Sequence, residues 1–121
     1  VENQLTIRMM GEATFDTGRA DLRSEFIPLL RKIGEILGKT KAEIIIAGHT
    51  DNVPLSGGPF GSNLGLSMAR AGSVAEFLLS KKNIDPRKLS TMGFGEYRPL
   101  ASNNTAEGRR KNRRVEIIVT M

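Results

Sequence analysis

The sequence predicts a single domain (residues 1–121) of the α/β (α+β) class, a two-layer sandwich of a mixed four-stranded sheet with two long helices and one short helix. Patterns typical of strands and helices alternate in the order β–α–β–α–β–(α)–β along the chain. Two stretches repeat apolar residues at the spacing of an amphipathic helix, and one short run is apolar and β-branched. The composition, 39% hydrophobic and 26% charged, is ordinary for one globular core.

The first strand and the first long helix follow from two patterns near the N-terminus. Residues 5–10, LTIRMM, alternate in polarity as a half-buried strand does. From Leu22 to Leu37, apolar residues recur at helical spacing and form one buried stripe. Pro28 lacks a backbone N–H and is tolerated only near the first turn. We therefore expect the helix to begin near Ser24, with Ser24 as its cap, and to stop at Gly38.

A second strand and the second long helix flank a long polar loop. Residues 42–48, AEIIIAG, are β-branched and apolar on both faces, which predicts a strand in the interior of the sheet. Residues 51–63, DNVPLSGGPFGSN, form the loop. We expect the helix to begin near Asn63 or Leu64 and to bury the side chains of Leu66, Val74, Phe77 and Leu78.

The last part of the chain predicts a strand, a short helix and a closing strand. Residues 89–94, LSTMGF, predict a strand that ends among glycines. The segment NNTAEGRRK predicts a short helix, because Asn104 can cap it and Glu107 follows three residues later, the spacing of a capping box. Residues 114–121, RVEIIVTM, close the chain as a strand with Val115, Ile117 and Val119 on one face.

Charge and cysteine content exclude some classes of protein. The net charge is +5, of which residues 107–116, EGRRKNRRVE, carry +3, so the chain is nearly balanced apart from one basic cluster. The absence of cysteine excludes a disulfide framework and a cysteine nucleophile. No run approaches the roughly 20 apolar residues that a membrane-spanning helix requires. Because Val1 starts almost inside a strand-like pattern, without an initiator Met, we expect a domain excised from a longer protein.

One acid and one base stand out around the long loop. Asp51 follows the end of an interior strand, where crevices form in open sheets, and Arg70 lies on or beside the apolar stripe of the next helix. Gly57, Gly58 and Gly61 allow the loop backbone to approach a ligand. A carboxylate and a guanidinium facing one pocket suit a zwitterion, which indicates an amino-acid-like ligand. Two structural alternatives stay open: the two side chains pair with each other, or Asp51 bonds the backbone two residues on.

Four motifs, in this order, resemble the OmpA-like peptidoglycan-binding domain: GHTDN, LSMARAGSV, MGFGEYRP and NNTAEGRRKNRRVEI. The segment FDTGRADL is similar to the family's opening segment, so the resemblance covers residues 15–119. The long loop NVPLSGGPFGSN is most similar to that of the periplasmic domains of MotB/PomB-type flagellar stator proteins. One departure is SNLGLS, where stator proteins commonly have SNWELS. Its glycine, Gly65, weakens the first turn of a helix by about 0.5–1 kcal/mol relative to alanine.

The resemblance implies a non-catalytic domain that grips the cell wall. Its ligand is the diaminopimelate of the peptidoglycan stem peptide, whose free end is an amino-acid group. The aspartate of the family's TDN motif matches Asp51 and holds the ammonium, and the arginine of its LSxxRA motif matches Arg70 and holds the carboxylate. No cofactor, metal or catalytic residue is implied. The resemblance assigns the surroundings of the site to Thr50, Asn52, Asn63 and one of Arg113 and Arg114, between which the sequence does not choose.

The resemblance also implies where such a domain works. It implies a homodimer in the periplasm of a Gram-negative cell, as part of an inner-membrane-anchored protein. In a stator the domain fixes an ion-driven motor unit to the wall, and its partner through the membrane segment is a MotA/PomA-type subunit. The alternative parent is an OmpA- or Pal-type outer-membrane protein or lipoprotein that tethers the outer membrane to peptidoglycan.

Two other classes of function fit the residues poorly. A hydrolase or zinc site would have to use His49, the only histidine, but no nucleophile elbow is present and scattered acids make a poor zinc site. We expect the His49 ring instead to bond backbone near the loop. The run RRKNRR suggests nucleic acid, but the chain has one tyrosine, no tryptophan and no aromatic residue among these bases. Base stacking therefore has little to work with, and we expect no nucleic-acid partner.

Overall fold

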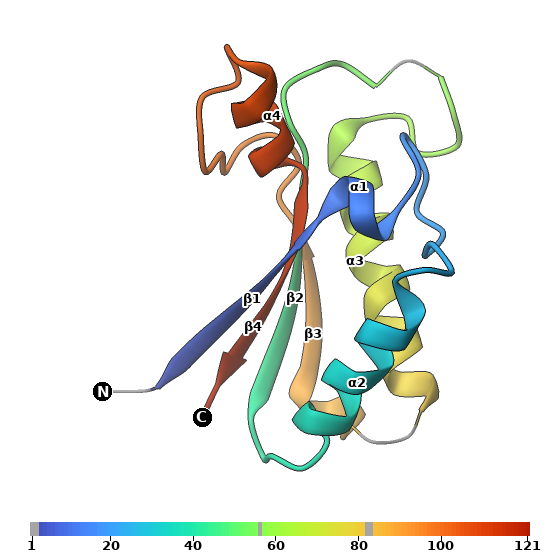
Figure 1. Cartoon of the computed structure of the whole chain (residues 1–121), viewed down its shortest axis with the longest axis vertical. Coiled ribbons are helices and arrows are strands. Elements are labelled where there is room, and N and C mark those ends of the chain that lie inside the picture. Colours follow the sequence, from blue (N-terminus) through green and yellow to red (C-terminus); the bar gives the residue numbers. More distant parts are fainter. Residues whose placement is uncertain (1–2, 56, 82–83) are drawn as a thin grey trace.

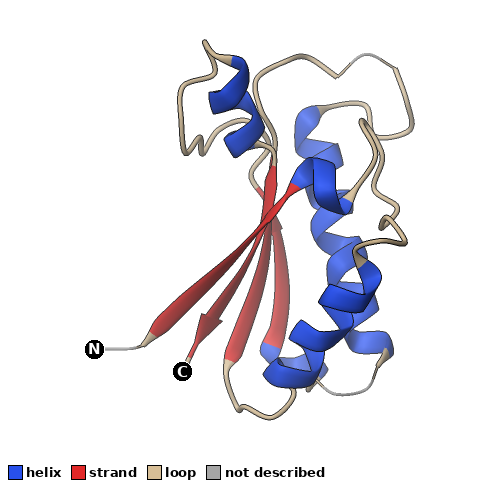
Figure 2. Cartoon of the chain, viewed as in Figure 1, coloured by secondary structure: helices blue, strands red, loops and turns tan. Residues whose placement is uncertain are grey.

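The computed structural model describes residues 3–55, 57–81 and 84–121. Its strands are β1 (Gln4–Met10), β2 (Glu43–His49), β3 (Leu89–Gly93) and β4 (Arg114–Thr120). Its helices are α1 (Gly11–Thr14), α2 (Ile27–Leu37), α3 (Asn63–Ser80) and α4 (Ala106–Asn112), with a 3-10 turn, η1, at Pro86–Lys88. Within the described residues, one four-stranded sheet has α2 and α3 on one face, which confirms the predicted two-layer α+β fold (Figure 1, Figure 2).

The sheet has the strand order β1–β4–β2–β3. β4 pairs antiparallel with both β1 and β2, whereas β2 pairs parallel with β3. The chain between β2 and β3 carries α3, because parallel neighbours need a crossover connection. β2 therefore lies inside the sheet, as its apolar sequence predicted. In register, Gly48 of β2 lies beside Gly93 of β3 and Val115 of β4.

The hydrophobic core lies between the sheet and the two long helices. Alternate residues of the interior strands face it, and Ile46 and Ile117 are completely buried there. As predicted, the apolar residues on one face of the last strand are buried, as are most of those expected on α3, while Phe77 is partly buried against the same core. The buried residues of these two predicted sets are Val115, Ile117, Val119, Leu66, Val74 and Leu78.

The predicted start of the first long helix is wrong by three residues. α2 begins at Ile27, after a turn in which the Ile27 N–H donates to the Ser24 carbonyl at 3.3 Å. Ser24 is not the cap, since its hydroxyl bonds Glu25, and the cap position belongs to Phe26 without a side-chain bond. Pro28 lies in the first turn of the shorter helix, where its missing N–H costs nothing.

The predicted cap of the short helix is wrong as well, by one residue. Thr105 caps α4, and its hydroxyl accepts a hydrogen bond from the Gly108 N–H at 3.0 Å. Asn104 lies just outside the helix, so the predicted capping box with Glu107 does not form. The structure also contains a one-turn helix, α1, directly after β1. Nothing in the sequence indicated this helix, because four residues are too few to show a helical pattern.

The second long helix touches the ends of two strands. An ideal Cβ on Gly48 would lie 2.1 Å from the Ser67 carbonyl oxygen, and one on Gly93 would lie 2.3 Å from the Met68 side chain. The Ser67 side chain is fully buried, and its hydroxyl accepts a hydrogen bond from the Gly95 N–H at 2.9 Å. Glycine at both strand ends therefore allows α3 to pack directly on the sheet backbone.

We expect Gly48→Ala to lower the free energy of unfolding by about 3 kcal/mol, because the added methyl group overlaps the α3 backbone, which cannot move as a flexible side chain does. Urea denaturation followed by circular dichroism measures this. Gly72→Ala is the matched control: apart from its own helix, no described residue has an atom within 4 Å of a Cβ at this position in α3, so the same change should raise stability by about 0.5–1 kcal/mol. Equal midpoints for Gly48→Ala and the wild type would contradict the tight packing.

Candidate functional site

A cavity of about 630 Å³ opens where β2 ends, between α1, the segment that follows it, the start of α3 and the end of α4. This volume is in the range of small-molecule sites. The lining carries both signs of charge in nearly equal number, as a site for a zwitterion or a charged peptide requires. Its charged residues are Glu12, Asp16, Asp51, Arg23, Arg70, Arg109 and Arg113.

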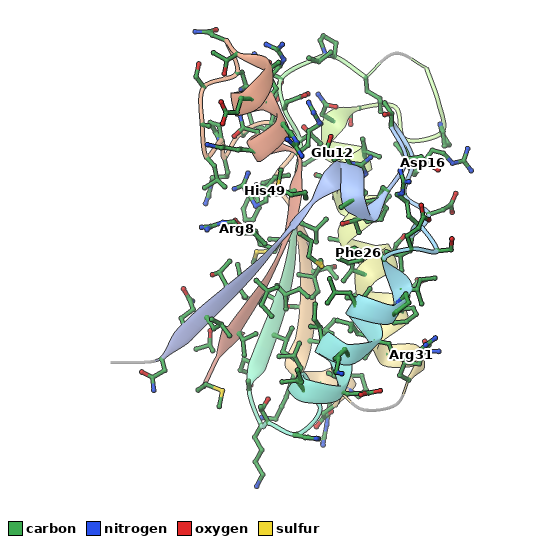
Figure 3. The ribbon with its side chains drawn as sticks, in the orientation of Figure 1. Arg8, Glu12, Asp16, Phe26, Arg31 and His49 are labelled. Carbon is green, nitrogen blue, oxygen red and sulfur yellow. The ribbon has the colours of Figure 1, made fainter. Side chains whose placement is uncertain are left out.

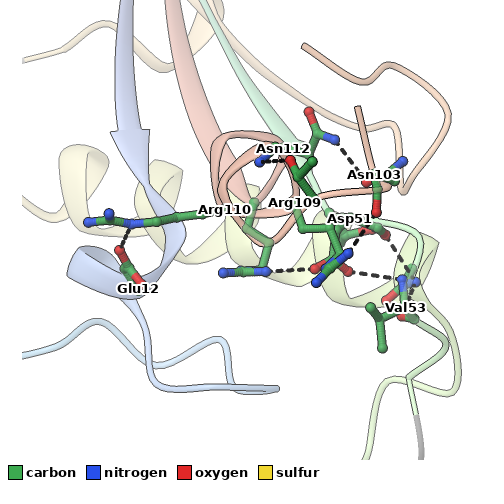
Figure 4. A network of polar contacts seen from close by, with 12 residues as sticks. Glu12, Asp51, Val53, Asn103, Arg109, Arg110 and Asn112 are labelled. Atoms are coloured by element: carbon green, nitrogen blue, oxygen red, sulfur yellow. Dashed lines mark hydrogen bonds and ion pairs between the residues drawn. The ribbon is translucent and has the colours of Figure 1, made fainter. Parts of the chain in front are cut away.

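Asp51 lines this cavity and is 7% exposed. Its Oδ1 accepts a hydrogen bond from the Val53 N–H at 3.1 Å, so the turn role that the sequence left open is present. Its Oδ2 accepts a hydrogen bond from Arg113 Nη1 at 2.7 Å. Figure 4 shows Asp51 beside Val53 in this network of polar contacts. A carboxylate has about four acceptor positions. Asp51 therefore keeps acceptor capacity for a ligand after both bonds are made.

Arg70 lies in the same cavity and is 5% exposed. Its Nε donates to the Arg19 carbonyl at 2.8 Å and its Nη2 donates to the Asp16 carbonyl at 3.1 Å. The guanidinium also lies over the Phe15 ring, 4.8 Å from its centre. Two of its five N–H donors are used in these bonds, and the other three donate to no described residue.

The charge of Arg70 survives its burial. Burial and, to a lesser extent, the nearby Arg113 lower the pKa of its guanidinium to about 10, while Asp51 partly opposes the change. The side chain therefore stays positive at neutral pH. No hydrogen bond or ion pair joins Asp51 to Arg70 among the described residues, so the alternative that the two side chains pair with each other is wrong.

Successive residues at the start of β4 point to opposite sides, and this separates Arg113 from Arg114. Arg113 lines the cavity and pairs with Asp51. Arg114 lies away from the cavity, 4% exposed, where its Nε donates to Glu116 at 2.9 Å and its Nη2 donates to the Arg98 carbonyl at 3.1 Å. Of the two arginines that the sequence left undecided, the cavity contains Arg113.

The three polar residues predicted around the site divide in the same way. Thr50 lines the cavity, and its hydroxyl donates to the Asp51 carbonyl at 2.8 Å. Asn63 also lines it, and its amide donates to the Val53 carbonyl at 2.9 Å, which holds the loop to the start of α3. Asn52 is exposed and lies outside the cavity, in a neighbouring groove.

Sequence reasoning missed several parts of the cavity, among them Glu12, Asp16 and Arg23 from the part of the chain between β1 and α2. Arg109 lines it from α4, and its Nη1 donates to the Asn103 carbonyl at 2.8 Å. The signal was available, because Arg109 precedes Arg113 by four residues and so lies on the same side of the helix. The carbonyls of Asp16 and Arg19 that hold Arg70 had no comparable signal, since any residue type offers a carbonyl.

His49 does not behave as predicted, and lies with Arg8 on the side of the sheet away from Phe26 and α2 (Figure 3). Its ring is 5% exposed and stacks on Phe94 at 5.1 Å. Neither ring nitrogen forms a hydrogen bond with a described residue, so the expected bond to backbone is absent. Burial is the main cause that lowers the pKa of His49 to about 4; Arg114 lowers it too, and Glu116 partly opposes them.

The described residues contain no cluster of three or more His, Cys, Asp or Glu side chains that could hold a metal ion. In the same part of the chain, every helix is too short or too polar to cross a bilayer.

The sequence profile of the OmpA family matches residues 14–113. The chain belongs to the OmpA family. This confirms the resemblance to OmpA-like peptidoglycan-binding domains, a non-catalytic family, and with it the prediction that the chain is not an enzyme.

Relatives of this OmpA-family chain include Motility protein B of Bacillus subtilis, 41% identical over 98% of the chain and 49% of that protein. Outer membrane protein Omp38 of Acinetobacter baumannii is 41% identical over 88% of the chain and 29% of that protein. The cell wall anchor of the type VI secretion system of Pseudomonas aeruginosa has the same fold, with a TM-score of 0.90, 38% identity, and coverage of 98% of this chain and 82% of that one. The chain spans half or less of the length of these two curated relatives.

The unfolding free energy of this OmpA-family domain should fall on acidification partly because of His49. Its pKa is lower in the folded state, about 4, than its ordinary 6.5, so the unfolded chain binds more protons between these values. The stabilising effect is complete above pH 6.5 and is lost as the pH falls towards 4, at about 1 kcal/mol per pH unit. His49→Phe keeps a flat ring on Phe94 and removes the titrating group.

Urea denaturation of both proteins at several pH values measures the difference. The slope of stability against pH should be steeper for the wild type than for His49→Phe between pH 4 and 6.5. Carboxylates away from the ring titrate in both proteins and cancel in the comparison. Glu116 is the exception: burial acts to raise its pKa, its hydrogen bonds to Arg114 and Arg8 lower it on balance, and His49 adds to the lowering, so a small part of the difference belongs to Glu116. Parallel curves would mean that His49 is not kept neutral by its surroundings.

Proposed function

We propose that this domain binds peptidoglycan without covalent chemistry, by holding the amino-acid end of diaminopimelate in the charged cavity. Asp51 takes the ammonium and Arg70 takes the carboxylate. One observation carries the proposal: two oppositely charged side chains, both more than nine-tenths buried, line one cavity without pairing with each other. Each is held by other bonds and keeps hydrogen-bonding capacity, as a ready-made site for a zwitterion requires.

The surrounding residues have distinct roles in this proposal. Arg113 shares the Asp51 carboxylate with the ligand ammonium and adds a positive charge beside the ligand carboxylate. Asn63 and Thr50 hold the loop that presents Asp51. Asn52 and Arg114, which the resemblance also assigned to the site, have no direct part, because they lie outside the cavity.

For the whole protein, we propose a MotB/PomB-type stator subunit that fixes a flagellar motor unit to the wall. Support comes from the relative named Motility protein B, which aligns with 98% of the chain. The parent protein would be anchored in the inner membrane, with this domain in the periplasm as a homodimer and a MotA/PomA-type subunit as its membrane partner.

A second candidate is a tether between the wall and another envelope structure. An outer-membrane relative reaches the same 41% identity over 88% of the chain, and the type VI secretion anchor has the same fold at 38% identity. In both candidates the domain binds peptidoglycan through the same cavity. They differ in which envelope structure the parent protein attaches to peptidoglycan.

We expect Asp51→Asn to weaken binding of a diaminopimelate stem peptide about 10- to 100-fold, because it removes the charge that holds the ammonium while the side-chain oxygen can still accept from Val53. Calorimetric titration measures the affinity, and co-sedimentation with purified sacculi tests the polymer. Glu107→Gln is the matched control, since it removes one acid from an exposed position on α4 outside the cavity.

Arg70→Lys tests the other half of the clamp. Lysine keeps the positive charge but cannot offer two parallel N–H groups, so stem-peptide affinity should fall by a similar factor while circular dichroism stays native. If Asp51→Asn and Arg70→Lys both fold and bind sacculi and stem peptide as the wild type does, the cavity is not the binding site.

A further inference from the structure

The short helix α4 carries two of the four described arginines that line the charged cavity. Arg109 lies within the helix and Arg113 is its C-cap, four residues later, so both reach the cavity from the same side of the helix. Arg113 pairs with Asp51 at 2.7 Å, and its carbonyl accepts a hydrogen bond from the Gly11 N–H at 2.8 Å. Half of the arginine charge of the cavity therefore depends on where α4 is held.

Apolar packing does not hold α4. Of its seven residues, the buried ones are Gly108 and Asn112, and neither has an apolar side chain to pack. A helix of this length is not stable by itself in water. Its ion pair to α1, between Arg110 and Glu12, is solvent-exposed, and exposed ion pairs contribute little to stability. Hydrogen bonds must therefore keep the body of α4 in place.

Asn112 supplies these bonds from a completely buried side chain. Its Oδ1 accepts hydrogen bonds from the Leu100 N–H at 2.8 Å and the Ala101 N–H at 2.9 Å. Its Nδ2 donates to the Ala101 carbonyl at 2.9 Å and to Asn103 Oδ1 at 2.8 Å, and Figure 4 shows Asn112 beside Asn103. A side-chain amide has two N–H donors and an oxygen with two lone pairs. Every hydrogen-bonding position of Asn112 is thus used to join α4 to residues 100–103.

Residues 100–103 in turn hold the arginine side of α4. The Asn103 carbonyl accepts a hydrogen bond from Arg109 Nη1 at 2.8 Å. An ideal Cβ on Gly108 would lie 1.8 Å from the Ser102 carbonyl oxygen, so the helix backbone touches this segment directly. The segment and the helix therefore form one unit, which the buried amide joins.

We infer that Asn112 is a positioning residue, whose buried amide holds Arg109 and Arg113 in the cavity. Asn112 does not line the cavity itself, so it acts through the two arginines. The inference rests on the proposed function, in which Arg113 shares the Asp51 carboxylate with the ligand. Without the amide, α4 loses its buried hydrogen bonds and both guanidinium groups are free to leave the cavity. The ligand site is then weakened although no residue that lines it has changed.

A double-mutant cycle tests this inference by calorimetric titration with the tripeptide L-alanyl-γ-D-glutamyl-diaminopimelate. We expect Asn112→Ala, introduced into the wild type, to weaken binding about fivefold. In a protein that carries Arg109→Gln and Arg113→Gln, the same change should alter affinity by less than about twofold, because the side chains through which it acts are gone. An equal loss of affinity in both backgrounds would show that Asn112 does not act through these arginines.

A ligand-free measurement keeps the test independent of the clamp. The NMR signal of the Arg113 Nε–H should move in Asn112→Ala toward its position in Asp51→Asn, because the ion pair between Arg113 and Asp51 is lost in both. An Arg113 signal that stays at its wild-type position overturns the inference, whether or not the tripeptide binds. Failure of the wild type to bind the tripeptide would overturn the clamp, and the NMR comparison would still decide the role of Asn112.

Two further variants complete the comparison. Asn104→Ala removes an exposed amide that forms no side-chain hydrogen bond with a described residue, and it should change neither the affinity nor the Arg113 signal. Asn103→Ala removes one of the four Asn112 bonds and keeps the backbone carbonyl that holds Arg109, so it should fold even if Asn112→Ala does not. It should lower the affinity about twofold and move the Arg113 signal in the same direction as Asn112→Ala.

Discussion

The contact of α3 with the ends of β2 and β3 is the constraint on which the rest of the structure depends. Gly48 and Gly93 leave the space in which the helix passes, and even one methyl group at either position would overlap it. Asp51 follows Gly48 by three residues, and Arg70 follows the contact residue Ser67 by three, less than one helical turn. The contact therefore brings an acid and a base from different elements into one cavity.

Asp51 and Arg70 are each stabilised by partners other than one another. Two carbonyls and an aromatic face hold the Arg70 guanidinium, while a backbone N–H and Arg113 hold the Asp51 carboxylate. Burying an unpaired ion is costly, so these bonds explain how both charges are tolerated. They also fix the two side chains before any ligand arrives, which reduces the ordering that binding requires.

The start of β4 contributes an arginine to each face of the sheet. Arg113 and Arg114 are neighbours in sequence, yet one lines the cavity and the other bonds Glu116 beside the buried ring of His49. On the far face, Arg8 of β1 bonds Glu116 of β4 at 2.9 Å, and the buried His49 ring at the end of β2 lies against this cluster without a hydrogen bond to a described residue. The strand that leads into Asp51 is thus paired with β3 and β4 at its edges and covered by α3 on one face.

The sequence by itself determined the strands, the two long helices and the pair of Asp51 and Arg70, because periodicity and turn residues are local signals and the motifs lie within short segments. Only the tertiary structure decided that Arg113, not Arg114, lines the cavity, and that the carbonyls of Asp16 and Arg19 hold Arg70. These partners are 51 to 62 residues apart in the chain. Local spacing carries no information about such contacts, since they exist only once the helix, the sheet and the loop have packed together.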